Sequence, residues 1–271
     1  MRLISYRHLL LALALVWPAA PALAAECQPV GGFDSWLATF RQEAAAKGIS
    51  QRGLDALDGV THDPAVLSHD RGQQVFRQSF EEFAGRMVST YRLKKGANLL
   101  LQHASLLSRI EQQYGAPGPV LVAIWGLESD FGANTGKFAT IRSLATLAHD
   151  CRRTDMFQAE LLAALRIVDR GDLSPSEMRG AWAGELGQTQ FMATSYLKFA
   201  VDFDGNGRRD LLRSVPDVLA STANYLKGYG WKRGQGWEPG EANFDVLLEW
   251  NKSQVYSRTI ALFASRLAGR E

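Results

Sequence analysis

The residue whose setting most suggests chemistry is Glu128, which lies in the most apolar segment of the chain after residue 24, residues 119–132. In a helix opened by the proline at its start, Leu121, Ile124, Trp125 and Glu128 share one face. Desolvation disfavours the charged form of a carboxyl group, so we expect Glu128 to keep its proton nearer to neutral pH. Such a carboxyl is suited to general acid catalysis. The spacing leaves open a buried salt bridge or a helix cap as the alternative.

Other catalytic motifs occur only as fragments, without the residues that must accompany them. Residues 132–137 read G-x-x-x-G-K, one residue short of a phosphate-binding loop and without its Ser or Thr. Residues 130–132 read Asp-Phe-Gly, but no His-Arg-Asp catalytic loop accompanies them. No histidine pair has the helical spacing of a zinc site, and the G-x-S-x-G motif of many hydrolases is absent. Metal-dependent hydrolysis and acyl transfer are therefore disfavoured.

A polar loop carries the beginning of a calcium-binding pattern. Asp202, Asp204 and Asn206 stand at positions 1, 3 and 5, a glycine stands at position 6, and Arg208 at position 7 would offer its backbone carbonyl. Position 12, which needs a bidentate glutamate, is Arg213. The loop therefore predicts weak binding of a structural calcium ion. An ordinary turn of Asx and glycine residues is the alternative.

The elements that must position these groups are mostly helical. Apolar stripes predict helices around residues 33–40, 99–110 and 157–168. A Ser-Pro-Ser-Glu sequence at 174–177 has the pattern of a capped helix start, and two further helices are predicted at 216–228 and 253–269. Alternating apolar and polar runs are few. We therefore expect a mainly α fold with at most a small β element.

The first 24 residues predict a secretory signal peptide. They contain Arg2 and Arg7, a short apolar run and an Ala-x-Ala ending. No later segment has the length of apolar residues that spans a membrane, and Glu26 before Cys27 does not suit a lipidation site. We therefore expect an exported, periplasmic protein without a lipid anchor or transmembrane segment.

Charge and cysteine content narrow the class further. The chain has 30 Lys and Arg and 28 Asp and Glu, a formal net charge of +2. Because the predicted signal peptide holds the two surplus arginines, the exported chain is neutral, which argues against nucleic acid as a partner. Cys27 and Cys151 could pair in an oxidising compartment, but the sequence does not decide whether they do.

Three motifs occur in the order found in one enzyme family. They are Trp125-Gly-Leu-Glu128-Ser-Asp-Phe-Gly132, Gly184-Glu-Leu-Gly-Gln-Thr-Gln190-Phe-Met192 and Asp202-Phe-Asp-Gly-Asn-Gly-Arg-Arg-Asp-Leu211. Together they resemble the membrane-bound lytic murein transglycosylase B family, glycoside hydrolase family 103. The similarity runs from about Phe33 to Leu267. The resemblance implies one catalytic domain over residues 25–271, with a lysozyme-like helical core and a helical subdomain.

The resemblance also implies a reaction. It is cleavage of the β-1,4 bond between N-acetylmuramic acid and N-acetylglucosamine in peptidoglycan without water, with Glu128 first as acid and then as base. The muramoyl C6 hydroxyl attacks C1 and leaves a 1,6-anhydro end. One acid suffices because the nucleophile belongs to the substrate, and no cofactor is required for the chemistry. Besides glycan strands, cell-wall synthesis or division proteins are candidate partners that the sequence does not identify.

Binding residues follow from the same resemblance. It implies substrate contacts by Gln190, Asn251 and Tyr256, although an amide such as Gln190 could instead bond only to loop backbone. For the calcium loop it implies closure by Asp217, with Asp210 as the alternative.

The chain departs from the family pattern at three positions. The family commonly has Ser at Ala181, a small residue at Glu185 and Pro at Ala193. These departures put substrate preference and rate in question. Two other functions therefore stay open: a hydrolytic muramidase helped by Asp130 or Glu185, and a catalytically idle wall-binding protein on the same fold.

Overall fold

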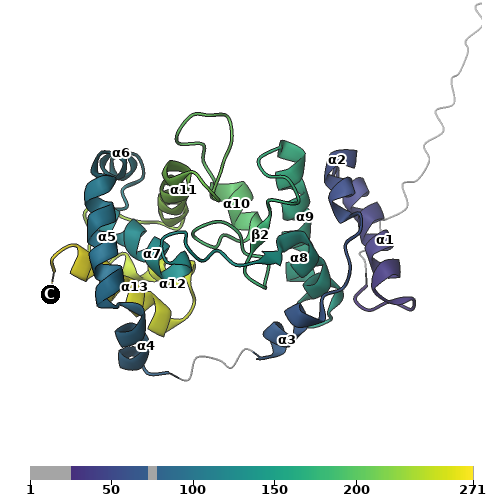
Figure 1. Ribbon diagram of the computed structural model, residues 1–271, viewed down its shortest axis with the longest axis horizontal. Helices are drawn as coiled ribbons and strands as arrows, with labels where there is room; N and C mark the ends of the chain where they lie inside the picture. Colours follow the sequence, from purple (N-terminus) through teal and green to yellow (C-terminus); the bar gives the residue numbers. More distant parts are fainter. Residues whose placement is uncertain (1–25, 73–77, 271) are drawn as a thin grey trace, which may run out of the picture.

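The computed structural model describes residues 26–72 and 78–270, so the predicted signal peptide lies outside the described residues. The described chain is mainly helical, as predicted (Figure 1). The elements in order are α1 (Gly32–Ala46), α2 (Gln51–Leu54), a 3-10 turn (Asp55–Leu57), α3 (Pro64–Gly72), α4 (Phe80–Met87), α5 (Thr90–Gln102), α6 (Ala104–Tyr114), α7 (Gly118–Ser129), β1 (Phe138–Ala139), α8 (Thr140–His149), α9 (Thr154–Arg170), β2 (Arg179–Gly180), α10 (Ala193–Phe199), α11 (Val215–Gly228), α12 (Phe244–Trp250) and α13 (Gln254–Leu267).

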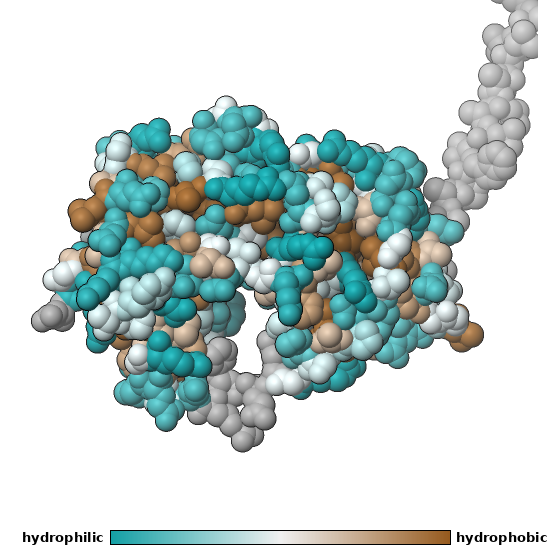
Figure 2. All heavy atoms as spheres, viewed as in Figure 1, coloured by the Kyte–Doolittle hydropathy of each residue, from teal (hydrophilic) through white to brown (hydrophobic). Residues whose placement is uncertain are grey.

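The helices form two groups with the short strands between them (Figure 1). One group holds α1, α2, α3, α8 and α9, and the other holds α4 to α7 with α11 to α13. Helix α10 packs on α9 and α11 and so joins the groups. Figure 2 shows that the surface is hollowed between them. The predicted small β element is the antiparallel pair of β1 and β2.

Helix α7 is the central helix of its group. It packs against α5, α6, α11 and α13, and ten of its twelve residues are buried. A helix enclosed in this way is apolar on all sides rather than on one stripe. Glu128 is its one ionisable residue.

The stripe predicted as one helix over residues 99–110 is two helices. Helix α5 ends at Gln102 and α6 begins at Ala104, with His103 between them at φ −104°. Both halves pack on α7, but α5 also packs on α13 whereas α6 packs on α11, so each half has an apolar side of its own. Apolar spacing does not reveal a change of direction confined to one residue, so the prediction of a single helix was wrong.

The predicted helix start at residues 174–177 is a turn. One half of the expected capping box forms, since Glu177 accepts hydrogen bonds from Ser174 N at 2.8 Å and Ser174 Oγ at 2.7 Å, while the Glu177 N–H bonds to the Ser174 carbonyl. The chain then enters β2 at Arg179, which pairs with β1. The backbone N–H and C=O groups after residue 178 therefore form hydrogen bonds between strands rather than within a helix. The helix prediction was wrong.

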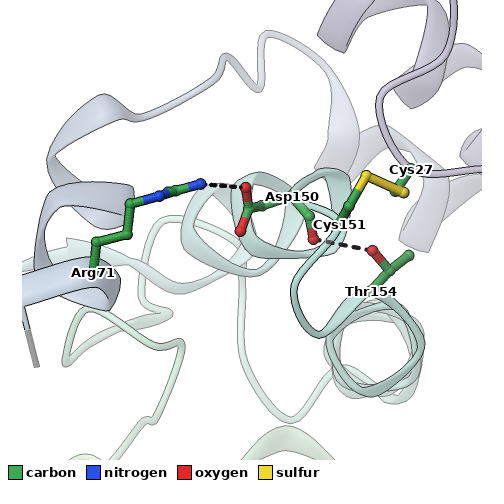
Figure 3. Close-up of a disulfide and its surroundings, with 5 residues drawn as sticks. All are labelled: Cys27, Arg71, Asp150, Cys151 and Thr154. Carbon is green, nitrogen blue, oxygen red and sulfur yellow. Dashed lines mark hydrogen bonds and ion pairs between the residues drawn. A yellow bond between two sulfur atoms is a disulfide. The ribbon is translucent and has the colours of Figure 1, made fainter.

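The two cysteines are joined in a disulfide. Cys27 and Cys151 have Cα atoms 5.1 Å apart, and the bridge ties the segment before α1 to the turn after α8 (Figure 3). Beside it, Arg71 pairs with Asp150 at 2.7 Å, which links α3 to the same turn. Within the described residues, no helix has the length and apolar character needed to cross a membrane.

Candidate active site

Glu128 lies near the carboxyl end of α7 and opens into a pocket of about 380 Å³. The pocket is bounded by α7, α10, α11, the end of α12 and the segment between β2 and α10. Its lining combines carboxyl, amide and hydroxyl groups with aromatic rings, which suits a polar ligand with apolar faces such as a sugar. The lining residues are Glu128, Ala181, Glu185, Gln190, Phe191, Met192, Ser195, Tyr225, Trp250 and Asn251.

Two side chains from the carboxyl-terminal helices hold the Glu128 carboxyl. Trp250 Nε1 donates a hydrogen bond to Glu128 Oε1 at 2.8 Å, and the Tyr256 hydroxyl forms another with the same carboxyl. Desolvation in this setting raises the pKa of Glu128 to about 7. The bonds from Trp250 and Tyr256 oppose that rise, and the negative charge of Glu185 adds to it. Glu128 is therefore protonated below about pH 7, as a general acid must be.

Pro119 and Asp130 mark the two ends of α7, the helix that carries Glu128. Pro119 lies in the first turn of the helix, as predicted, and the last residue of the helix is followed by Asp130 in the left-handed conformation at φ 53°. Asp130 pairs with Arg92 at 3.4 Å, and Lys95 Nζ donates to its backbone carbonyl at 3.2 Å. Asp130 is thus a capping residue with its own partner, and it does not line the Glu128 pocket.

Gln190 lies in the pocket wall and also ties the surrounding loop together. Its Nε2 donates to the carbonyls of Gly187 at 2.7 Å and Thr135 at 3.1 Å. Its backbone is left-handed at φ 53°. Few residues other than glycine adopt this conformation, and the two bonds to the loop hold Gln190 in it. The structure therefore combines both alternatives for Gln190, a loop bond and a place in the pocket.

Asn251 and Tyr256 lie at different depths. Asn251 lines the pocket, and its Oδ1 accepts from Ser253 N at 3.0 Å just before α13. Tyr256 is 8% exposed, and its ring contacts Phe83 with centroids 5.9 Å apart. Its hydroxyl reaches Glu128, and the surface that remains lines a separate pocket beside Arg92. In this structure Tyr256 therefore supports the acid rather than offering a face to the Glu128 pocket.

Sequence reasoning misses Trp250 as the partner of Glu128. The two residues are 122 positions apart, and a tryptophan at the end of an apolar helix is ordinarily a core residue. Its position directly before Asn251, a residue that the family resemblance places in the substrate site, is the signal that could have identified it.

The polar loop after α10 brings three predicted ligands together. Asp202, Asp204 and Asp217 each offer a carboxylate oxygen within 4.8 Å of the others. Asn206 lies in the same loop, where its Oδ1 accepts from Arg208 N at 2.9 Å. Oxygen donors of this kind are the ligands that calcium prefers, so the residues fit the ion.

Asp210, the other candidate to close the loop, points elsewhere. Its Oδ1 accepts from the backbone N–H groups of Leu212 and Arg213, both at 3.0 Å. Asp217 instead lies at the start of α11, where its carboxylate accepts from Phe203 N at 2.7 Å and Asp210 N at 2.9 Å. The fold thus favours Asp217, because α11 carries it back onto the loop.

Comparison with known proteins gives consistent matches. A model of the Transglycosylase SLT domain family matches residues 32–240. Membrane-bound lytic murein transglycosylase B of Escherichia coli (strain K12) is 35% identical over 150 residues, which are 55% of this chain and 41% of that protein. The chain therefore spans about two fifths of the length of that curated relative.

Solved structures resemble most of this chain. SltB3 from Pseudomonas aeruginosa, in complex with NAG-anhNAM-pentapeptide, aligns with a TM-score of 0.84 and 35% identity over 89% of this chain and 80% of that chain. The soluble lytic transglycosylase SltB1 of the same organism aligns with a TM-score of 0.80 and 25% identity over 86% and 98%. These likenesses confirm the predicted lysozyme-like helical fold. Because the family model covers most of the chain, this protein belongs to the Transglycosylase SLT domain family, as its three motifs predict.

Proposed function

We propose that this protein is a peptidoglycan lytic transglycosylase and that Glu128 is its catalytic acid and base. The observation that carries the proposal is a glutamate held by Trp250 and Tyr256 in a pocket, with its pKa raised to about 7. Relatives support the substrate class: one is named a murein transglycosylase, and SltB3 was crystallised with NAG-anhNAM-pentapeptide and with NAG-NAM-pentapeptide.

The proposed reaction uses one carboxyl group twice. Neutral Glu128 donates its proton to the oxygen that links N-acetylmuramic acid to N-acetylglucosamine, and the C1–O bond breaks. The resulting Glu128 carboxylate takes the proton of the muramoyl C6 hydroxyl, whose oxygen bonds to C1. The proton that left Glu128 is thereby replaced, no water is consumed, and the products are a free 4-hydroxyl and a 1,6-anhydro end.

The raised pKa of Glu128 suits both steps. A carboxyl that titrates near neutral pH carries the proton that a leaving oxygen needs, and its charged form is basic enough to assist removal of a proton from an alcohol. Trp250 and Tyr256 donate to the charged form, so they stabilise Glu128 at the stage between the two transfers. Gln190 and Asn251 are the proposed substrate contacts, since both line the pocket with amide groups.

A hydrolytic muramidase is the second candidate function. The observation that favours it is Glu185, a second carboxyl in the Glu128 pocket, because hydrolysis of a glycoside ordinarily needs two carboxyl groups. Asp130, the other proposed helper, pairs with Arg92 and lies outside the pocket lining. The two reactions differ in their products and are separated by the measurement that closes the Discussion.

We propose a structural calcium ion at Asp202, Asp204 and Asp217. Asn206 and the backbone carbonyl of Arg208 complete the proposed ligand set. The support is the convergence of the three carboxylates. An ion there would offset their mutual repulsion and fix the loop between α10 and α11, with no part in the chemistry.

The proposed place of action is the periplasm. The support is the secretory pattern of the first 24 residues together with the murein named as the substrate of a relative. The disulfide agrees with an oxidising compartment.

The test of the function is the release of soluble muropeptides from purified sacculi by the parent protein and by Glu128→Gln. Release by the parent and loss of at least about a thousandfold in the variant are expected. Equal release by both proteins would contradict the catalytic role of Glu128.

A further inference from the structure

A second carboxyl, that of Glu185, shares the pocket with Glu128. Its Oε2 atom is buried and has no hydrogen-bond partner among the described residues. The other attachments of the carboxyl are to backbone N–H groups of Ala183 and of Glu185 itself. Burying a carboxyl oxygen without a partner costs free energy. A bound molecule that donates a hydrogen bond to this carboxyl would offset that cost.

The backbone around Glu185 is fixed rather than adaptable. Gly180 lies so close that a Cβ atom there would be 1.6 Å from the Glu185 carbonyl oxygen. Gly184 has φ 90°, and a Cβ atom there would lie 2.3 Å from the Leu144 side chain. Leu186 exchanges two 2.9 Å backbone hydrogen bonds with Phe191 on the other side. Glu185 is therefore presented to the pocket from a turn that close contacts hold in place.

The charged groups around the pocket favour a hydrogen-bond donor as ligand. Among the described residues, the only charged side chains that line it are Glu128 and Glu185, and no lysine or arginine does. The positive charge that acts on Glu185 is that of Arg153, whose Nη2 atom pairs with Asp70 and whose Nε atom makes no hydrogen bond to Glu185 or to another described residue. Glu160 repels Glu185, and burial raises the pKa of Glu185. No described group in this wall therefore satisfies Oε2.

We propose that Glu185 is a substrate-contacting, specificity-determining residue whose carboxyl accepts a hydrogen bond from an O–H or N–H group of the sugar in the Glu128 pocket. The proposal rests on the proposed function, because it takes a peptidoglycan glycan as the occupant. Such a donor is a hydroxyl or acetamide N–H of the native sugar, or the ammonium of a de-N-acetylated one. Glu185 thus contributes to binding, whereas the proton transfers stay with Glu128.

Binding is measured best without turnover. The affinity of a soluble tetrasaccharide of alternating N-acetylglucosamine and N-acetylmuramic acid is compared by calorimetry for Glu128→Gln and for Glu128→Gln/Glu185→Ala. Loss of the acceptor is expected to weaken binding about fivefold to tenfold. The conservative substitution Glu185→Gln in the same background keeps a carbonyl oxygen and is expected to stay within about threefold of Glu128→Gln. Glu111→Ala, which removes an exposed glutamate outside the pocket, is the matched control.

Two further measurements complete the test. With Glu128 intact, Glu185→Ala is expected to raise KM on sacculi and to leave the kind of product end unchanged. Because the charge of Glu185 contributes to the raised pKa of Glu128, kcat is compared well below pH 7, where Glu128 is protonated in both proteins, and is expected to be unchanged there. A partly de-N-acetylated tetrasaccharide separates the donors. If the donor is an ammonium, the native carboxylate at Glu185 should bind this ligand more tightly than the amide introduced by Glu185→Gln, whereas a neutral donor predicts equal binding. Either result supports the contact.

The outcomes that overturn the proposal are distinct. Equal affinity of Glu128→Gln and the Glu185→Ala double variant would overturn it alone. A fall in kcat with a change of product end in Glu185→Ala would also overturn it, because Glu185 would then take part in the chemistry. Failure of Glu128→Gln to bind the tetrasaccharide would overturn the proposed function as well. Melting curves of both Glu185 variants establish that they fold.

Discussion

The Trp250 indole donates a 2.8 Å hydrogen bond to Glu128 Oε1, which joins the end of α12 to the end of α7 across 122 residues. Tyr256, from the first turn of α13, reaches the same carboxyl, and α13 packs along α7. The acid is therefore oriented by the carboxyl-terminal helices. Because both donors stabilise the carboxylate, they limit a rise in pKa that burial would carry further.

Replacement of Trp250 by Phe should shift the pH dependence of activity upward. The parent loses activity as pH rises through about 7, where Glu128 loses its proton. Without the indole donor the carboxylate is less stable, so the pKa of Glu128 rises and the alkaline limb of kcat/KM moves to higher pH. The rate on the acid side of this limb should fall about tenfold, because the carboxyl is less well oriented.

The matched control for Trp250 is Trp237→Phe. The Trp237 indole is buried and, like that of Trp250, donates a hydrogen bond; its acceptor is Ser265 Oγ at 3.1 Å, outside the Glu128 pocket. We expect its alkaline limb to coincide with that of the parent. An unshifted limb in Trp250→Phe would show that the hydrogen bond does not set the titration of Glu128.

The raised pKa of Glu128 should also be visible in folding stability. Between about pH 4.5 and 7 the folded protein keeps a proton that the unfolded chain releases, so stability falls as pH rises through that window. Glu128→Gln carries no such titration. As pH rises through this window, the parent should therefore lose about 1–3 kcal/mol of unfolding free energy that the variant keeps.

Urea unfolding on the two sides of the window measures this difference. Glu111→Gln, an exposed glutamate on α6, should differ from the parent by the same amount on both sides. A Glu128→Gln difference that does not depend on pH would mean that the pKa of Glu128 in the folded protein is close to the ordinary value.

The Cys27–Cys151 bridge should contribute to stability and not to chemistry. It closes a separation of 124 residues, and constraining an unfolded chain over such a loop is worth about 2–5 kcal/mol. The double substitution Cys27→Ser/Cys151→Ser should lower the free energy of unfolding by that amount. Muropeptide release by the folded variant should be unchanged, because neither cysteine lines the Glu128 pocket. A large loss of release by a folded double variant would refute this separation.

Local patterns in the sequence predict much of this fold. The proline start of α7, the glycine end of α9 and the capped start of α13 are each determined by a few adjacent residues. The sequence also singles out Glu128, because a lone acid among apolar residues is visible without any knowledge of its neighbours.

Features that depend on distant partners are the ones that local patterns miss. The break at His103 reflects tertiary packing, because α5 and α6 both contact α7 but α5 also packs on α13 and α6 on α11. The turn at residues 174–177 reflects the pairing of β2 with β1. The Trp250 contact requires α12 to lie beside the end of α7, and Asp217 reaches the calcium loop only because α11 returns to it. Each is a tertiary relation that periodicity does not encode.

Chelation should lower the melting temperature, and calcium should restore it at concentrations of about 0.1–1 mM. The physical reason is that an ion would offset the repulsion among Asp202, Asp204 and Asp217. Asp217→Asn should abolish the response. Asp210→Asn, which changes a neighbouring carboxylate outside the cluster, should keep it. A parent melting curve that stays the same at millimolar calcium would remove the metal from the account.

The most direct test of the central claim is the mass of the muropeptides that the parent protein releases from purified sacculi. Intramolecular attack by the C6 hydroxyl predicts 1,6-anhydromuramoyl ends, each lighter by one water than a reducing end, and their absence from digests with Glu128→Gln. Reducing ends as the main product would contradict the transglycosylase mechanism and favour a hydrolytic muramidase.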